Sequence, residues 1–126
     1  ASWDVAVIQF PLMGSLCRNE LPLDENRVKR AMAAWIGRAK ELKAAGTHVI
    51  FLSLPQHTPM KQHCVTNAKV HSWNALILPE VRARGFDILD VSSISSPFYH
   101  QFPLSDGVHP HGPMNDLLAQ VLLNAI

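Results

Sequence analysis

The chain has 126 residues, of which 48% are hydrophobic and 17% charged, which is enough apolar sequence for one globular domain with its own core. Eleven Lys and Arg residues nearly balance ten Asp and Glu residues, and these charges are scattered, which argues against a nucleic-acid-binding protein. The longest apolar runs are far shorter than a bilayer requires, so no membrane span is expected.

The first predicted strand covers residues 4–10, a short run of β-branched and other apolar residues that Pro11 ends. A helix is predicted to follow, from a cap at Asp24 to a stop at Gly46, because apolar residues recur there every three or four positions. Trp35 falls on the apolar side of this helix and is expected in the core.

The second predicted strand covers residues 48–54 and leads into a loop. The next helix is predicted over residues 67–84 and is closed by Gly85. Its apolar face includes Trp73, which is expected in the core. Pro79 lies inside the pattern and predicts a kink or a break.

The third predicted strand covers residues 86–91, followed by a long loop over residues 92–111 and a closing helix that begins at Pro113. Strands and helices thus alternate along the whole chain. This alternation predicts an α/β fold in which right-handed crossovers build a parallel sheet with helices on both faces. We expect a single domain over residues 1–126.

Three segments are expected to meet at one edge of this sheet, where the strands end and where such folds bind their ligands. They are residues 11–18, 55–64 and 105–109. The last of them contains an Asp-x-x-His step from Asp106 to His109. A carboxylate three residues before a histidine is well placed to orient the imidazole as a general base. A capped turn with a surface histidine is the alternative interpretation of this step.

The stretch Asp106-Gly107-Val108-His109-Pro110 resembles the last block of the SGNH, or GDSL-type, esterases. Residues 73–76 and 86–91 are also similar to the penultimate helix and strand of that family. The resemblance covers most of the chain and implies the carboxyl-terminal half of a three-layer αβα domain with a flavodoxin-like sheet. It further implies that His109 is the base that deprotonates a serine, that Asp106 orients His109, and that no cofactor takes part.

Other blocks of the family are missing or altered. No Gly-Asp-Ser block, which carries the family's nucleophilic serine, occurs in the sequence. The family's third block would fall on residues 11–14, so Met13, Gly14 and Ser15 are expected in the substrate or oxyanion region. Met13 stands where the family usually has an amide donor, and methionine cannot donate the hydrogen bond that an oxyanion hole needs. The PC-esterase group departs at the same block, and the chain resembles that branch. Ser15, beside Gly14, is the best candidate nucleophile within the chain, ahead of Ser53 and Ser105. A loop hydroxyl that is hydrogen-bonded to the backbone is the alternative interpretation of Ser15.

The position of the first predicted strand also indicates that part of the domain is not contained in these residues. In a flavodoxin-like order, residues 4–10 would be the third strand, so the chain lacks the sheet's first strands. Residues 4–10 would then form an apolar edge without a neighbour. We therefore expect another segment, of this polypeptide or of a partner chain, to pair with residues 4–10 and to supply the serine.

The leading hypothesis is a portion of a serine esterase or acyltransferase that acts on an acyl ester of a small molecule, a lipid or a glycan. Two alternatives stay open. One is a catalytically inactive domain of the same fold that binds a partner or has a structural role. The other is a plain α/β interaction domain in which the Asp-x-x-His step occurs by chance.

Cysteine and histidine side chains are the other candidates for reactive or metal-binding groups. Cys17 and Cys64 are interpreted as free thiols or as one disulfide, and less readily as nucleophiles. His57, His63, Cys64 and His71 offer zinc-ligand chemistry, but their spacing matches no familiar metal motif, so no metal site is expected.

Overall fold

The computed structural model describes residues 4–9, 20–54, 66–98 and 112–126. Within them, three strands form one sheet in the order β1-β2-β3: β1 (Val5–Gln9), β2 (His48–Leu52) and β3 (Asp87–Leu89). Both neighbouring pairs are parallel. The three strands are therefore those that the sequence predicts, each two or three residues shorter.

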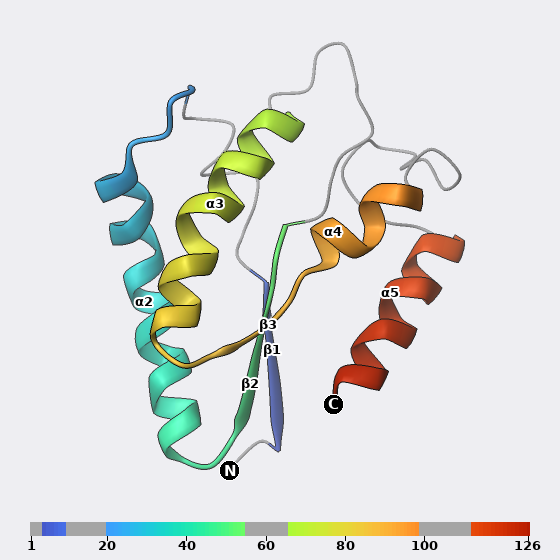
Figure 1. The fold of residues 1–126 in the computed structure, drawn as a ribbon. Helices are drawn as coiled ribbons and strands as arrows, with labels where there is room; N and C mark the ends of the chain where they lie inside the picture. Colours follow the sequence, from blue (N-terminus) through green and yellow to red (C-terminus); the bar gives the residue numbers. More distant parts are fainter. Residues whose placement is uncertain (1–3, 10–19, 55–65, 99–111) are drawn as a thin grey trace.

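Helices lie on both faces of the sheet (Figure 1). On one face are α2 (Glu25–Ala44) and α3 (Asn67–Ala83), which follow β1 and β2 in the chain. On the other face are α4 (Val91–Ser95), which continues into the 3₁₀ helix η1 (Ser96–Phe98), and α5 (Gly112–Ala125). The predicted three-layer αβα architecture with a parallel sheet is confirmed. No helix in the described ranges is both long and apolar enough to cross a membrane.

Helix α2 begins and ends where its sequence signals predict. The Asp24 carboxylate accepts a hydrogen bond from the Arg27 backbone N–H at 3.1 Å, which caps the first turn. Gly46 follows the last turn with φ of +90°, a conformation that costs other residues free energy. Between these ends the helix buries one apolar stripe, composed of Val28, Met32, Ile36 and Ala39.

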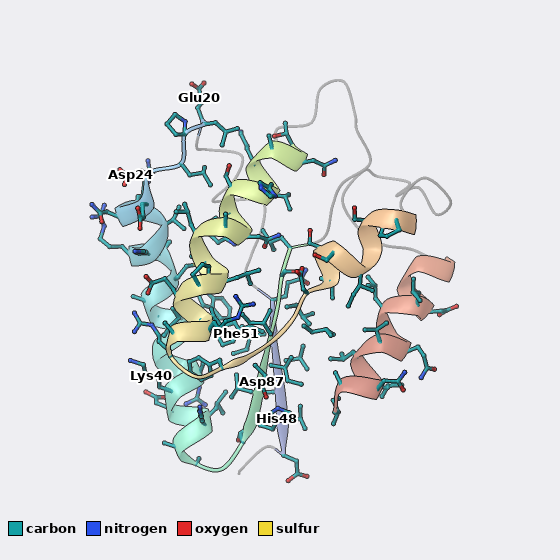
Figure 2. All side chains as sticks on the ribbon, viewed as in Figure 1. Glu20, Asp24, Lys40, His48, Phe51 and Asp87 are labelled. Atoms are coloured by element: carbon teal, nitrogen blue, oxygen red, sulfur yellow. The ribbon has the colours of Figure 1, made fainter. Side chains whose placement is uncertain are left out.

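The core lies between this helical layer and the sheet. Phe51 of β2 is fully buried at its centre (Figure 2) and meets Phe86 edge to face, with ring centroids 5.3 Å apart. Trp73 of α3 is almost completely buried beside them, as predicted. Full burial of one such side chain contributes about 1.5–3 kcal/mol, so this cluster is what holds α2 and α3 on the sheet.

Trp35 does not belong to that core, and the expectation for it was wrong. Its residue surface is 42% exposed. Helical spacing puts Trp35 on the flank of α2 opposite Ala33, Gly37 and Lys40, which line a groove shared with α3. The periodicity identified an apolar side of the helix, but no element in the described part of the chain covers this flank.

Two further expectations are refined by the structure. Helix α3 continues from Asn67 through Pro79 to Ala83, so Pro79 does not break the helix. The predicted loop over residues 92–111 begins instead as α4 and η1, since Asp90 is not the end of a strand but the N-cap of α4. The rest of that loop lies outside the described residues.

Candidate active site

The parallel register brings the carboxyl ends of the three strands together. Gln9 pairs with Leu52, and Leu52 pairs with Leu89, so β1, β2 and β3 all end at one edge of the sheet. From β1 and β2 the chain continues into residues 10–19 and 55–65. From β3 it continues through α4 and η1 into residues 99–111. This carboxyl edge is where α/β folds place ligands.

The residues predicted for the site all belong to segments that follow β1 or β3 in the chain. The proposed base and its orienting acid, His109 and Asp106, fall in 99–111, and the substrate or oxyanion group, Met13, Gly14 and Ser15, falls in 10–19. All five lie outside the described residues. The described structure supplies the scaffold from which these segments extend.

A hydrogen-bonded network ties β2 to α4 at this edge. The Ser53 hydroxyl donates to Asp90 Oδ1 at 2.7 Å and accepts from the Ser92 backbone N–H at 2.9 Å. Asp90 also accepts from the Ser93 backbone N–H at 3.2 Å and from the Ser93 hydroxyl at 2.8 Å. We call these four residues the Ser53–Asp90 network. It fixes the start of the segment that leads toward Asp106 and His109.

The network decides the charge of Asp90. Partial burial alone would raise the pKa of this carboxyl group, but the hydrogen bonds from Ser53 and Ser93 favour the ionised form and hold its pKa below the ordinary value of 3.8. Asp90 is therefore an anion near neutral pH. Its carboxylate accepts hydrogen bonds from the hydroxyl groups of Ser53 and Ser93 and from backbone N–H groups in the first turn of α4.

Ser53 has no part in nucleophilic chemistry in this arrangement. Its residue surface is 1% exposed, so an ester has no access to the hydroxyl oxygen. The hydroxyl proton is directed to a carboxylate, whereas an activated serine gives its proton to an imidazole. Among the serines considered from the sequence, Ser53 is thus structural.

A second anchor holds the end of β2 from the helical layer. The buried Asn74 side chain of α3 accepts a hydrogen bond from the Leu54 N–H and donates one to the Leu54 carbonyl, both at 2.9 Å. One amide thus satisfies both backbone groups of the residue that precedes the 55–65 segment. Ser53 and Asn74 together fix the two residues that follow β2.

Charged side chains also lie at the other end of the sheet, where β2 and β3 begin. His48 Nε2 and Asp87 Oδ2, from the first residues of β2 and β3, are 2.7 Å apart (Figure 2). They border a hollow of about 280 Å³. A second hollow, of about 220 Å³, is the groove between α2 and α3. Neither lies at the carboxyl edge, so neither belongs to the candidate site.

The metal and thiol expectations fall mainly outside the described residues. This is the case for His57, His63, Cys64 and Cys17, while His71 is exposed on α3. Within the ranges that the structure describes, no three His, Cys, Asp or Glu side chains are grouped as metal ligands would be.

Sequence reasoning missed the Ser53–Asp90 network. Residues 53 and 90 are 37 positions apart, and only the fold brings them together. One local signal was present: an aspartate three residues before Ser93 fits the spacing of a helix N-cap.

Comparison with known proteins supports the fold. No protein-family profile matches the chain, and no curated protein matches it by sequence. Among solved structures, the chain is similar to a lipase/acylhydrolase from Enterococcus faecalis, with a TM-score of 0.76 and 15% sequence identity. The match covers 98% of this chain and 60% of the acylhydrolase chain. The resemblance to the SGNH-type hydrolases is thus confirmed as a likeness of fold.

Proposed function

We propose that this chain is the portion of an acyl-ester hydrolase or acyltransferase that carries the catalytic base. The observation that carries the proposal is positional. The Asp106–His109 step follows β3, α4 and η1 in the chain, β3 ends at the carboxyl edge of a parallel sheet, and the fold is similar to that of an acylhydrolase. The same step in an unrelated fold would be no more than a turn and a histidine.

The proposed reaction is acyl transfer through a serine. His109 takes the proton of the serine hydroxyl as its oxygen attacks the ester carbonyl, and then gives that proton to the departing alcohol. Asp106 orients the imidazole and stabilises its protonated form. Water or a second alcohol then attacks the acyl-enzyme, which releases the acid or a new ester. The substrate is an acyl ester of a small molecule, a lipid or a glycan.

The sequence contains no clear match to the family's nucleophilic serine or to its oxyanion-hole donors. We infer that the serine comes from a segment outside residues 1–126, since the chain has no Gly-Asp-Ser block. Ser15 is the candidate within the chain. Backbone N–H groups around Met13 and Gly14 are the local donors available to the oxyanion, because the Met13 side chain has none to offer.

A second candidate function has one observation in its favour. Met13 stands where the family has an amide donor, and loss of that donor fits a catalytically inactive domain that binds a partner or has a structural role. Such a protein would keep the fold and bind its partner but would hydrolyse no ester.

Hydrolysis of a chromogenic acetyl ester separates the two functions. The protein produced from its natural gene is compared with its His109→Ala variant, and His111→Ala is the matched control two residues away. We expect His109→Ala to lower the rate by about 10²–10⁴-fold, as loss of a general base does, and His111→Ala to leave it nearly unchanged. Equal rates for all three proteins would contradict the proposed role of His109.

A further inference from the structure

The outer edge of β1 carries backbone groups that no described strand pairs. The Asp4 carbonyl accepts from the His48 N–H at 2.9 Å, which fixes how β1 faces β2. Backbone groups alternate sides along a parallel strand, so those of Ala6 and Ile8 also face β2. The N–H and C=O groups of Val5, Val7 and Gln9 therefore point away from the sheet.

This edge lacks the features by which proteins protect exposed strands. Val5 to Ile8 contains no charge, proline or glycine, and Val7 is 39% exposed. Parallel strands are normally enclosed on both sides, and exposed apolar edges favour pairing with another strand. β1 thus has the sequence of an interior strand at the edge of the described sheet.

Trp35 lies on the same side of the molecule. Helix α3 packs against β3, which is on the far side of β2 from β1. The flank of α2 that faces away from α3 therefore faces the β1 side, and Trp35 is on that flank with 42% of its surface exposed. The open strand edge and the exposed indole form one lateral surface, which we call the β1–Trp35 seam.

We propose that the β1–Trp35 seam binds a strand that runs parallel to β1 and a helix that packs on Trp35, both from a segment outside residues 1–126. The choice of occupant rests on the fold comparison. The match covers 60% of the acylhydrolase chain, so the rest of that chain has no counterpart in residues 1–126. A parallel strand with its crossover helix is the unit that continues a sheet of this kind.

The seam does not depend on the proposed chemistry. An inactive domain of the same fold would need the same strand beside β1, so failure of ester hydrolysis would leave the seam untouched. Conversely, an active enzyme with an unpaired β1 edge would overturn the seam and leave the role of His109 intact.

Hydrogen exchange tests the strand. In the protein produced from its natural gene, we expect the amides of Val5, Val7 and Gln9 to exchange on the order of 100-fold more slowly than unprotected amides. Trp35→Glu is expected to remove most of that protection because it places a charge beneath the docked helix. Arg30→Glu, at an exposed position on another side of the same helix, is the matched control and should preserve it. Rapid exchange of these three amides in the unmodified protein would overturn the proposal.

Cross-linking identifies the occupant. A photoreactive benzoylphenylalanine in place of Trp35 keeps an aromatic side chain at the seam, and mass spectrometry locates the residue to which it links. The expected product joins position 35 to a segment outside residues 1–126. A link to a second copy of residues 1–126, a link to residues 10–19, or no link at all would each overturn the proposal.

Discussion

Ser53 is itself buried and satisfies two partly buried partners with a single hydroxyl group, so its removal should be costly. Ser53→Ala leaves the Asp90 carboxylate without its shortest donor and the Ser92 N–H without this acceptor. We expect the free energy of unfolding, measured in urea, to fall by about 1–3 kcal/mol. Ser93→Ala is the control: its hydroxyl also donates to Asp90, but at an exposed position, so the loss should be smaller. A Ser53→Ala variant within about 0.5 kcal/mol of the unmodified protein would contradict this role.

Asp90 makes stability depend on pH in a defined direction. Its folded pKa is lowered, so its contribution is fully present above the ordinary value of 3.8 and is lost as pH falls through the folded pKa. Urea unfolding of the protein and of Asp90→Asn, from pH 2 to pH 6, should show a difference in stability that grows with pH and then levels off once the pH is above the ordinary pKa of 3.8. A difference that stays constant over this range would mean that the charge of Asp90 contributes nothing.

Substitution of Asn74 should lower the stability more than substitution of Ser53, because one buried side-chain amide makes hydrogen bonds to two backbone groups. Asn74→Ala leaves the Leu54 N–H and carbonyl without these partners in a buried place, and we expect a loss of about 2–4 kcal/mol from two such hydrogen bonds. Asn74→Asp keeps an acceptor for the N–H but has no donor for the carbonyl. Both variants should unfold at lower urea concentration than the unmodified protein. Unchanged midpoints would show that the 55–65 segment is held in another way.

At the scale of elements, substitution of two glycines by alanine should change the stability of the protein in opposite directions. One glycine lies inside α2 and the other follows it. Gly37 lies inside α2 with open space where a Cβ would go, so Gly37→Ala should stabilise the protein by about 0.5–1 kcal/mol. Gly46 also has open space, but its φ of +90° disfavours any side chain, so Gly46→Ala should cost about 1–2 kcal/mol. Thermal unfolding of the pair checks both signs. The same sign in both variants would contradict the assigned backbone conformations.

The elements that the sequence predicted well are those with a signal spread over many residues. The capped apolar periodicity of α2 and the β-branched run of β2 are examples, and both lie within two residues of their predicted bounds at each end. Helix α4 was missed because it is short and rests on a single cap at Asp90. Trp35 was misplaced because periodicity identifies the apolar side of a helix but not whether a neighbour covers that side.

At the scale of the whole molecule, the order of strands and helices was enough to predict a parallel αβα fold, and the likeness to the acylhydrolase confirms it. From the sequence, the candidate site could be predicted only as a region near the carboxyl ends of the strands. Parallel strands bring their carboxyl ends together, and Met13, Gly14, Ser15, Asp106 and His109 lie in segments that follow β1 or β3 in the chain. The Ser53–Asp90 network was not predictable, because it joins residues that are distant in sequence. It forms only when the residue after β2 lies beside the first turn of α4.

Mapping of a serine-directed phosphonate probe tests most directly whether this edge is an acyl-transfer site. The protein produced from its natural gene is treated with a fluorophosphonate, digested, and searched for the modified residue by mass spectrometry. We predict one labelled serine, in a segment outside residues 1–126 or at Ser15, and loss of that label in His109→Ala but not in His111→Ala. Absence of any labelled serine, or a label that His109→Ala leaves unchanged, would contradict the assignment of His109 as the base.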